Sequence, residues 1–295
     1  MINYSIIIPH KNIPKLLERC VNSIPQRKDV EIIIIDDCSN NVNELLNLEI
    51  LKRDKVKLIL LEKSKGAGFA RNEGIKHAKG RWILFADADD FYTNFISNLF
   101  DKYAFDSHTD MVFLNAQAID DCNVTSTLPI DLYISNYIKH KTYSEKVIRY
   151  AHWVPWTRMV KRNMIDNFNI SFDEIPIGND AMFSLKCSKI SKIIAVEPDI
   201  IYNYYKPSTG SCTSHYYVIN NLEARINLRY RINDFYKEVG FLYKLPIIIE
   251  YIRHKNKNYE FTRKYMQLLK KYKYSLLNDI YNTIIYYIGK ILSII

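Results

Sequence analysis

Cysteine is scarce in this chain, and its pattern argues against two of its common uses. The 295 residues contain five cysteines, and no two of them form a CxxC pair. They are Cys20, Cys38, Cys122, Cys187 and Cys212. An odd, scattered set is typical neither of a disulfide framework nor of a zinc site. We therefore predict that the protein works in a reducing cytosol.

Long apolar runs are also lacking. No stretch reaches the roughly 18 to 20 uninterrupted apolar residues that a spanning helix needs, and Lys290 interrupts the apolar last turns of the chain. The N-terminal sequence MINYSIIIPHKN has neither a basic leader nor a small-residue cleavage site, so it predicts a first strand and no signal peptide. The expected location is the cytoplasm. A second expectation is that the protein binds peripherally to the inner face of the cytoplasmic membrane.

Glycine is rare as well, but it is concentrated. Four of the eight glycines fall within residues 66–80, GAGFARNEGIKHAKG. A turn of small residues that opens a helix, with Arg71 in its first turn, can hold a phosphate through backbone N–H groups and a guanidinium. The segment has no GK[ST] and does not complete GxGxxG, so alone it is a weak motif.

The first 115 residues alternate between strand-like and helix-like patterns. Four consecutive isoleucines in residues 32–35 are typical of a strand that is covered on both faces. The predicted strands are 3–8, 30–35, 56–61 and 82–86, and the predicted helices are 14–24, 42–52 and 69–78. This order predicts an α/β fold with a mainly parallel sheet and flanking helices.

Polar residues follow three of these strands at the point where each strand ends. They are residues 9–12, then Asp36 and Asp37, then Asp87, Asp89 and Asp90. Open parallel sheets bind ligands at the carboxyl ends of their strands. Three clustered aspartates are costly without a cation, so we expect a positive partner there.

The positive charge of the chain lies mostly at its C-terminal end. From His215 onward there are 14 lysines and arginines against 6 aspartates and glutamates, which gives +8 of the total of +9. We predict a domain at 1–214, with halves 1–115 and 116–214, followed by a basic helical extension at 215–295. Such a charge favours an anionic partner. Nucleic acid is not expected, because the basic segment has no groove-reading motif.

Taken together, four motifs resemble those of inverting family 2 glycosyltransferases with a GT-A fold. They are IIIPHKN, EIIIIDDCS, GAGFARNEGIKHAKGRWILFADADDFY and IGNDAMF, in this order. The resemblance covers roughly residues 1–210 and is closest to bacterial enzymes that build capsule, lipopolysaccharide or other surface glycans. It implies transfer of a sugar from a nucleotide-diphosphate donor to a glycan or lipid-linked acceptor. The expected donor is a UDP-sugar.

The resemblance also assigns roles on the donor side. Asp87-Ala88-Asp89 fits the family's DxD motif, so Asp89 and Asp87 are the expected ligands of Mn²⁺ or Mg²⁺. The other residues expected at the donor are Pro9, Lys11, Asp36, Asp37, Gly66 and Arg71, with Asp37 on the base and Arg71 on the diphosphate. At Lys11 the family commonly has an aromatic residue, and lysine cannot stack on the base in the same way.

On the acceptor side the resemblance points to Asp180, Asn179 and Trp156. Asp180 occupies the position of the family's catalytic base, which takes the proton of the acceptor hydroxyl. Many relatives have Glu-Asp where this chain has Asn179-Asp180. Trp156 matches a tryptophan that in relatives lies by the acceptor, although a buried core tryptophan is an equally good interpretation.

The same residues could have purely structural roles. The aspartates at 87–90 could cap a helix that begins near Thr93, and Asp180 could cap the helix that follows it. Asp36 and Asp37 could serve a turn, and Arg71 could be a solvated arginine on a helix surface. A nucleotide-sugar-binding protein without turnover is also compatible with Lys11 and Asn179.

An apolar stripe runs along the C-terminal end, at positions 277, 280, 284, 288, 291 and 295. Such a stripe packs most often on the protein's own core or on a second subunit. It could instead lie on the membrane beside the lysine-rich residues 255–273, close to a lipid-linked acceptor.

Overall fold

The computed structural model describes residues 1–207, 221–252 and 259–272 together with residues 280, 281 and 284. The chain divides into two compact units. Met1–Glu174 and Asn179–Ser208 form the first, and Ile175–Gly178 and Thr209–Ile295 form the second. The predicted boundary after residue 214 lies outside the described residues.

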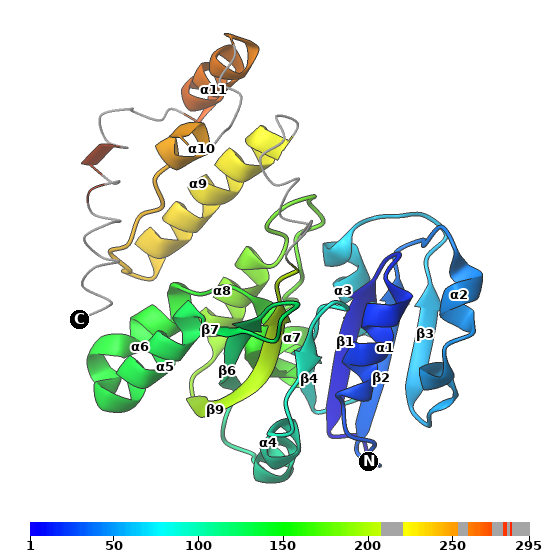
Figure 1. The fold of residues 1–295 in the computed structure, drawn as a ribbon. Helices are drawn as coiled ribbons and strands as arrows, with labels where there is room; N and C mark the ends of the chain where they lie inside the picture. The colour runs from blue at the N-terminus through cyan, green and yellow to red at the C-terminus, as the bar shows by residue number, and fades with distance from the viewer. Residues whose placement is uncertain (208–220, 253–258, 273–279, 282–283, 285–295) are drawn as a thin grey trace. The chain divides into compact units, whose positions relative to one another are not determined.

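The first half of unit one is the predicted series of parallel strands and crossover helices (Figure 1). In chain order it contains β1 (Tyr4–His10), α1 (Pro14–Asn22), β2 (Val30–Asp36), α2 (Val42–Leu46), a 3-10 turn (Glu49–Lys52), β3 (Val56–Leu60), α3 (Ala67–His77) and β4 (Trp82–Phe85). The strands lie in the order β3-β2-β1-β4 and are all parallel. The α/β fold class predicted from the sequence is therefore confirmed.

The apolar runs of β1 and β2 form the centre of the core. Ile6, Ile7 and Ile8 of β1 are buried, as are Ile33 and Ile34 of β2. Successive residues of a strand point to opposite faces of the sheet. Because helices cover both faces of this parallel sheet, the residues on both faces must be apolar. This explains the unbroken isoleucine run.

The helix predicted for residues 42–52 is wrong in its length. It ends at Leu46, Leu48 has an extended backbone, and a separate 3-10 turn follows. Asn47 stands at the helix C-terminus, where a short polar side chain with low helix propensity is better tolerated than in a helix interior.

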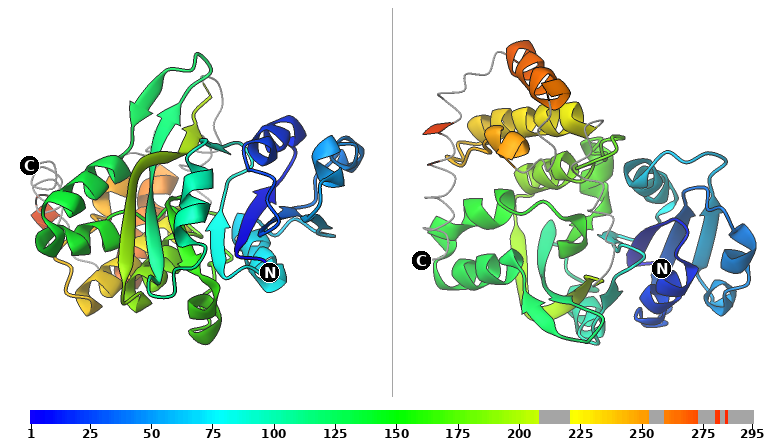
Figure 2. Two further views of the ribbon diagram at one scale, coloured as in Figure 1. Left: turned by 90° about the horizontal axis from the view of Figure 1, so that it is seen from below. Right: turned by 45° about the horizontal axis from the view of Figure 1, so that its top comes forward.

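The second half of unit one extends the same sheet with strands of mixed direction. The elements are β5 (Phe91–Tyr92), α4 (Ile96–Tyr103), β6 (Met111–Ile119), β7 (Thr125–Thr127), α5 (Pro129–Lys139), α6 (Lys141–Tyr150), a 3-10 turn (Pro155–Thr157), β8 (Arg158–Lys161), α7 (Arg162–Asn167), α8 (Ala181–Ile190) and β9 (Ile194–Tyr205). β8 is antiparallel to β4 and β6, and the long strands β6 and β9 are parallel. Figure 2 shows their curvature.

The regular elements in the described part of unit two are helices. It contains α9 (Leu222–Glu238), α10 (Ile248–Ile252) and α11 (Tyr259–Lys271), which share a small apolar core. The buried carboxylate of Glu250 accepts hydrogen bonds from Arg225 and Arg229 of α9. Helices therefore make up most of the described part of the predicted extension.

Among the described residues, no helix combines the length and the apolar character that a membrane crossing requires. Of the six positions of the predicted apolar stripe, 280 and 284 are described and exposed, and the other four lie outside the described residues. The four cysteines that the structure describes are all free thiols.

Candidate active site

Three aspartates lie directly behind β4, and the structure gives them different surroundings. Asp90 is fully buried and accepts hydrogen bonds from the Tyr202 hydroxyl (2.8 Å) and the Tyr205 backbone N–H (2.7 Å). Asp87 and Asp89 remain partly accessible. Helix α4 begins only at Ile96 and has no side-chain cap, so none of these aspartates caps it.

The pKa values of Asp89 and Asp90 are both raised. Burial raises the pKa of Asp89 to about 6, and the charge of Asp87 adds to this rise. Burial together with the charges of Asp87 and Asp89 holds the pKa of Asp90 well above its usual range. The cluster is therefore electrostatically unfavourable in its ionised form, and a cation would relieve the repulsion.

Two carboxylates of this cluster fit a hard divalent cation. Asp87 and Asp89 would supply oxygen ligands, which suit Mg²⁺ or Mn²⁺. Within the described ranges, no three His, Cys, Asp or Glu side chains come together in a way that could hold a metal ion. An ion bound at Asp87 and Asp89 would thus take its remaining ligands from water or from phosphate oxygens of a substrate.

Arg71 of α3 joins two of the sequence motifs. Its guanidinium lies 2.6 Å from Asp87 Oδ1 and donates to Asn179 Oδ1 at 2.9 Å. The side chain is buried, so the alternative of a solvated arginine is wrong. The bridge brings Asn179 into contact with the residues that follow β4, and Asp180 is its next neighbour in the chain.

The glycines of the 66–80 segment allow close approaches. Gly66 has a φ of +86°, which favours glycine, and precedes the first turn of α3. A Cβ on Gly68 would lie 2.2 Å from the Asp173 carbonyl oxygen and 3.0 Å from Asn179 Cβ. Only a glycine at 68 lets α3 pack directly against the segment that leads to Asp180.

Asp180 stands at the N-cap position of α8, but its side chain makes no capping hydrogen bond. It is half-buried. Burial raises the pKa of Asp180, while the nearby charge of Arg71 acts in the opposite direction. A carboxylate with a raised pKa is a better proton acceptor than an exposed one. The capping alternative therefore does not account for this side chain.

The loops after β1 and β2 are tied together by a network that the sequence analysis did not identify. The β1–β2 register pairs His10 with Asp36, and His10 Nδ1 lies 2.8 Å from Asp36 Oδ1. Asp36 also accepts the backbone N–H and the hydroxyl of Ser39. Burial opposes ionisation of Asp36, but these hydrogen bonds prevail and lower its pKa. Asp36 therefore serves the turn, as the alternative interpretation expected.

Asp37 points to the glycine segment. Its carboxylate accepts hydrogen bonds from the Ser64 hydroxyl (2.7 Å) and from the backbone N–H groups of Lys65 (2.7 Å) and Gly66 (3.1 Å). Lys11 donates to the Ser64 hydroxyl at 2.6 Å. The sequence analysis did not identify Ser64, because an isolated serine in a lysine-rich loop carries no signal of its own.

Arg19, which was not among the predicted site residues, holds the loop that contains Asp87, Asp89 and Asp90 in place. Arg19 of α1 donates to the Asp89 carbonyl oxygen at 2.6 Å. Its guanidinium also lies over the rings of Phe91 and Tyr205, at 4.7 and 4.2 Å from the centroids. Arginine contacts of both kinds are favourable, and they hold the backbone beside the two candidate metal ligands.

Two predicted residues have surroundings that leave their roles open. Trp156 is 5% exposed, and its ring stacks on Tyr202 (4.8 Å) and Tyr204 (5.8 Å). Pro9 belongs to β1 and is half-buried. Contact of Trp156 with the acceptor and of Pro9 with the donor stay predictions.

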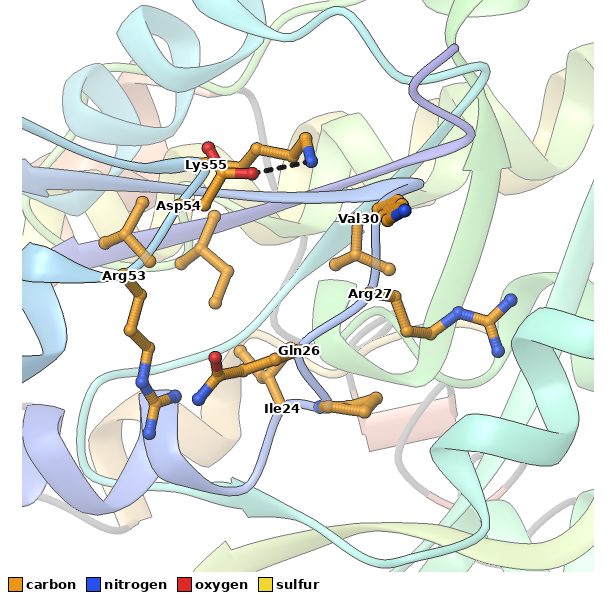
Figure 3. A pocket seen from close by; sticks show the side chains of 11 residues that line it. Ile24, Gln26, Arg27, Val30, Arg53, Asp54 and Lys55 are labelled. Atoms are coloured by element: carbon orange, nitrogen blue, oxygen red, sulfur yellow. Dashed lines mark hydrogen bonds and ion pairs between the residues drawn. The ribbon is translucent and has the colours of Figure 1, made fainter.

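A cavity of about 200 Å³ lies at the other end of the strands (Figure 3). Its lining includes Val30 and Val56, the first residues of β2 and β3. Arg27, Arg53 and Lys55 on its wall are engaged by neighbouring side chains. Because the aspartates follow the carboxyl ends of the strands, this cavity is not part of the candidate active site.

The chain is similar in sequence to known glycosyltransferases. The chain is 25% identical over 208 residues to the uncharacterized glycosyltransferase EpsJ of Bacillus subtilis. This alignment covers 68% of this chain and 60% of EpsJ. It is 25% identical over 268 residues to the poly(ribitol-phosphate) beta-N-acetylglucosaminyltransferase TarP of Staphylococcus aureus strain N315, covering 88% of this chain and 77% of TarP. Against TarS of S. aureus strain MW2 the identity is also 25%, and the match spans only 38% of TarS.

Solved structures share the fold. A crystal structure of S. aureus TarS residues 1–349 with UDP-GlcNAc superposes with a TM-score of 0.73 at 20% identity, covering 92% of this chain and 80% of that one. The mannosyltransferase PcManGT of Pyrobaculum calidifontis with GDP-Man and Mn²⁺ gives a TM-score of 0.52 at 14% identity, covering 99% of this chain and 81% of that one. The sequence model described as glycosyl transferase family 2 matches residues 5–168. With this match over more than half of its length, the chain belongs to glycosyl transferase family 2.

Proposed function

We propose that the protein is a metal-dependent, inverting glycosyltransferase that moves a sugar from a nucleotide-diphosphate donor, a UDP-sugar, to a glycan or lipid-linked acceptor. The observation that carries the proposal is the Arg71 bridge between Asp87 and Asn179. It ties Asp87, one candidate metal ligand, to Asn179, the neighbour of the candidate base Asp180. The name of the relative TarP, a poly(ribitol-phosphate) beta-N-acetylglucosaminyltransferase, supports surface-glycan synthesis as the setting.

Each charged group has a role in this mechanism. Asp87 and Asp89 would hold a divalent cation, which when bound would supply positive charge to the departing diphosphate. Arg71 positions Asp87 and adds positive charge beside the phosphates. The bond between the anomeric carbon and the diphosphate oxygen breaks with its electron pair on oxygen. The acceptor oxygen forms the new bond from the opposite face.

Asp180 takes the proton from the acceptor hydroxyl during this attack. Its raised pKa increases its basicity relative to an exposed aspartate. The carboxylate makes no capping bond to α8, which leaves it available for this task.

Two variants test these roles separately. Thermal stabilisation by UDP with Mn²⁺ measures donor binding, and we expect Asp89→Ala to abolish the metal-dependent part of it. Asp180→Asn should keep this stabilisation and lose about 100- to 10,000-fold in transfer rate. Near-normal transfer by Asp180→Asn would remove it from the role of base. No metal-dependent stabilisation of the wild type by any nucleoside diphosphate would refute the proposal.

For the C-terminal unit we keep two partners as proposals, an anionic membrane surface and a second copy of the chain. Arg263, Met266 and Lys270 are exposed on α11, while Phe261 and Tyr265 are buried in the unit's own core. Flotation with vesicles containing phosphatidylglycerol tests the first partner, and light scattering of the purified protein tests the second.

A further inference from the structure

Lys11 and Asp37 form a charged couple at the carboxyl ends of β1 and β2. Lys11 Nζ lies 3.7 Å from Asp37 Oδ2, and both groups contact the Ser64 hydroxyl, at 2.6 and 2.7 Å. The Lys11 side chain is 42% exposed, whereas that of Asp37 is 8% exposed. The ammonium therefore lies on the solvent side of a mostly buried carboxylate.

The two groups have opposite hydrogen-bonding capacities. A lysine ammonium only donates, and an ionised carboxylate only accepts. Asp37 Oδ1 accepts the backbone N–H of Lys65, and the N–H of Gly66 lies between both carboxylate oxygens, at 3.2 Å from Oδ1 and 3.1 Å from Oδ2. Oδ2 is the oxygen that lies 3.7 Å from Lys11 Nζ. The hydroxyl of Ser64 can turn, and it can give up its place on Oδ2 to another donor.

We propose that this couple selects the base of the donor. Lys11 donates to a carbonyl at position 4 of a pyrimidine, while Asp37 accepts the N–H at position 3. The inference rests on the proposed function, in which Asp37 meets the base, and it makes Lys11 a specificity-determining residue. The substrate class is then a donor with uracil or thymine.

Cytosine is disfavoured at the same place for two reasons. It has the same outline as uracil, so the shared ribose and diphosphate contacts would bring the same ring positions to Lys11 and Asp37. Its amino group at position 4 is a donor that would face the ammonium, and its bare ring nitrogen is an acceptor that would face the carboxylate. Repulsive contacts of this kind give discrimination beyond what attraction alone provides.

The test compares UDP and CDP, which differ only in the base. Dissociation constants are measured by calorimetry with saturating Mn²⁺, so that the phosphate and metal contributions are common to both. For the wild type we expect UDP to bind about tenfold or more tightly than CDP, as for a site built to pair with polar groups of one substrate. Lys11→Met should reduce this ratio by about tenfold, through weaker UDP binding and relief of the repulsion of CDP.

Three further variants separate direct contact from structural support. Lys11→Arg keeps a cationic donor and should keep the preference for UDP. Ser64→Ala leaves both Lys11 and Asp37 in place and should also keep it. Lys15→Met, which removes an exposed lysine from the start of α1, should change neither constant and controls for the loss of one positive charge.

Each outcome decides a different point. If Lys11→Met weakens UDP and CDP equally, or if the wild type binds both equally well, Lys11 does not read position 4 and the inference fails while the proposed function stands. If Ser64→Ala loses the preference as fully as Lys11→Met, Lys11 acts through Ser64 and the inference also fails. If no nucleoside diphosphate binds to the wild type with Mn²⁺, the proposed function itself fails.

Discussion

Replacing Arg71 by methionine removes a buried cation from between Asp87 and Asn179. Arg71 is 7% exposed in its side chain and Asp87 is 32% exposed, so water can solvate the stranded carboxylate only in part. Breaking a fully buried pair costs about 3–5 kcal/mol, and the accessibility of Asp87 lowers this to about 2–4 kcal/mol. The loss should appear as a lower free energy of unfolding.

A double-mutant cycle isolates the interaction. Asp87→Asn alone leaves Arg71 with an amide partner, and the double variant Arg71→Met/Asp87→Asn has no stranded charge. We therefore expect the double variant to lose about 1–3 kcal/mol less than the sum of the single losses. Urea unfolding in EDTA at pH 8, followed by tryptophan fluorescence, measures the free energy of unfolding of each variant. The three tryptophans, Trp82, Trp153 and Trp156, all lie in the same unit as Arg71.

A matched control comes from α7. Arg162 and Asp166 form an ion pair at 3.8 Å with side chains 40% and 50% exposed, so Arg162→Met should cost no more than about 0.5 kcal/mol. Additive single losses at Arg71 and Asp87, within about 0.5 kcal/mol, would refute the view that the bridge holds the site together.

Three other predictions concern the metal, the helix packing and the second unit. Because the carboxylate form of Asp89 binds the metal and its pKa is raised to about 6, Mn²⁺ affinity measured by electron paramagnetic resonance should fall as the pH drops through about 6; an unchanged affinity between pH 7.5 and 5 would contradict this. Gly68→Ala forces a Cβ to within 2.2 Å of the Asp173 carbonyl oxygen, so it should cost about 1–3 kcal/mol in urea unfolding and weaken UDP binding; wild-type stability would contradict it. Glu250→Gln neutralises a buried partner of Arg225 and Arg229, so it should lower the melting temperature in circular dichroism at pH 8; an equal or higher value would show that the pairs are not needed.

Local patterns were enough to predict the parallel half of the fold. Four consecutive isoleucines at 32–35 require a strand covered on both faces, and that requirement follows from burial alone. The clustered aspartates after β4 were also identifiable, because like charges at a strand end need a positive partner. The end of the helix at Leu46 was not predicted, since apolar periodicity continues past it and the break at Asn47 and Leu48 carries no strong local signal.

The sequence by itself determined which residue types lie at the carboxyl ends of the strands, because strand order and period follow from local hydrophobic patterns. Only the tertiary structure decided what those residues contact. Arg71 and Asn179 are 108 positions apart, and Asp90 is 112 and 115 positions from its partners Tyr202 and Tyr205 on β9. No local pattern encodes such distances. The pairing of His10 with Asp36 and the couple of Lys11 with Asp37 likewise depend on the register between two strands, which is fixed by packing of the whole sheet.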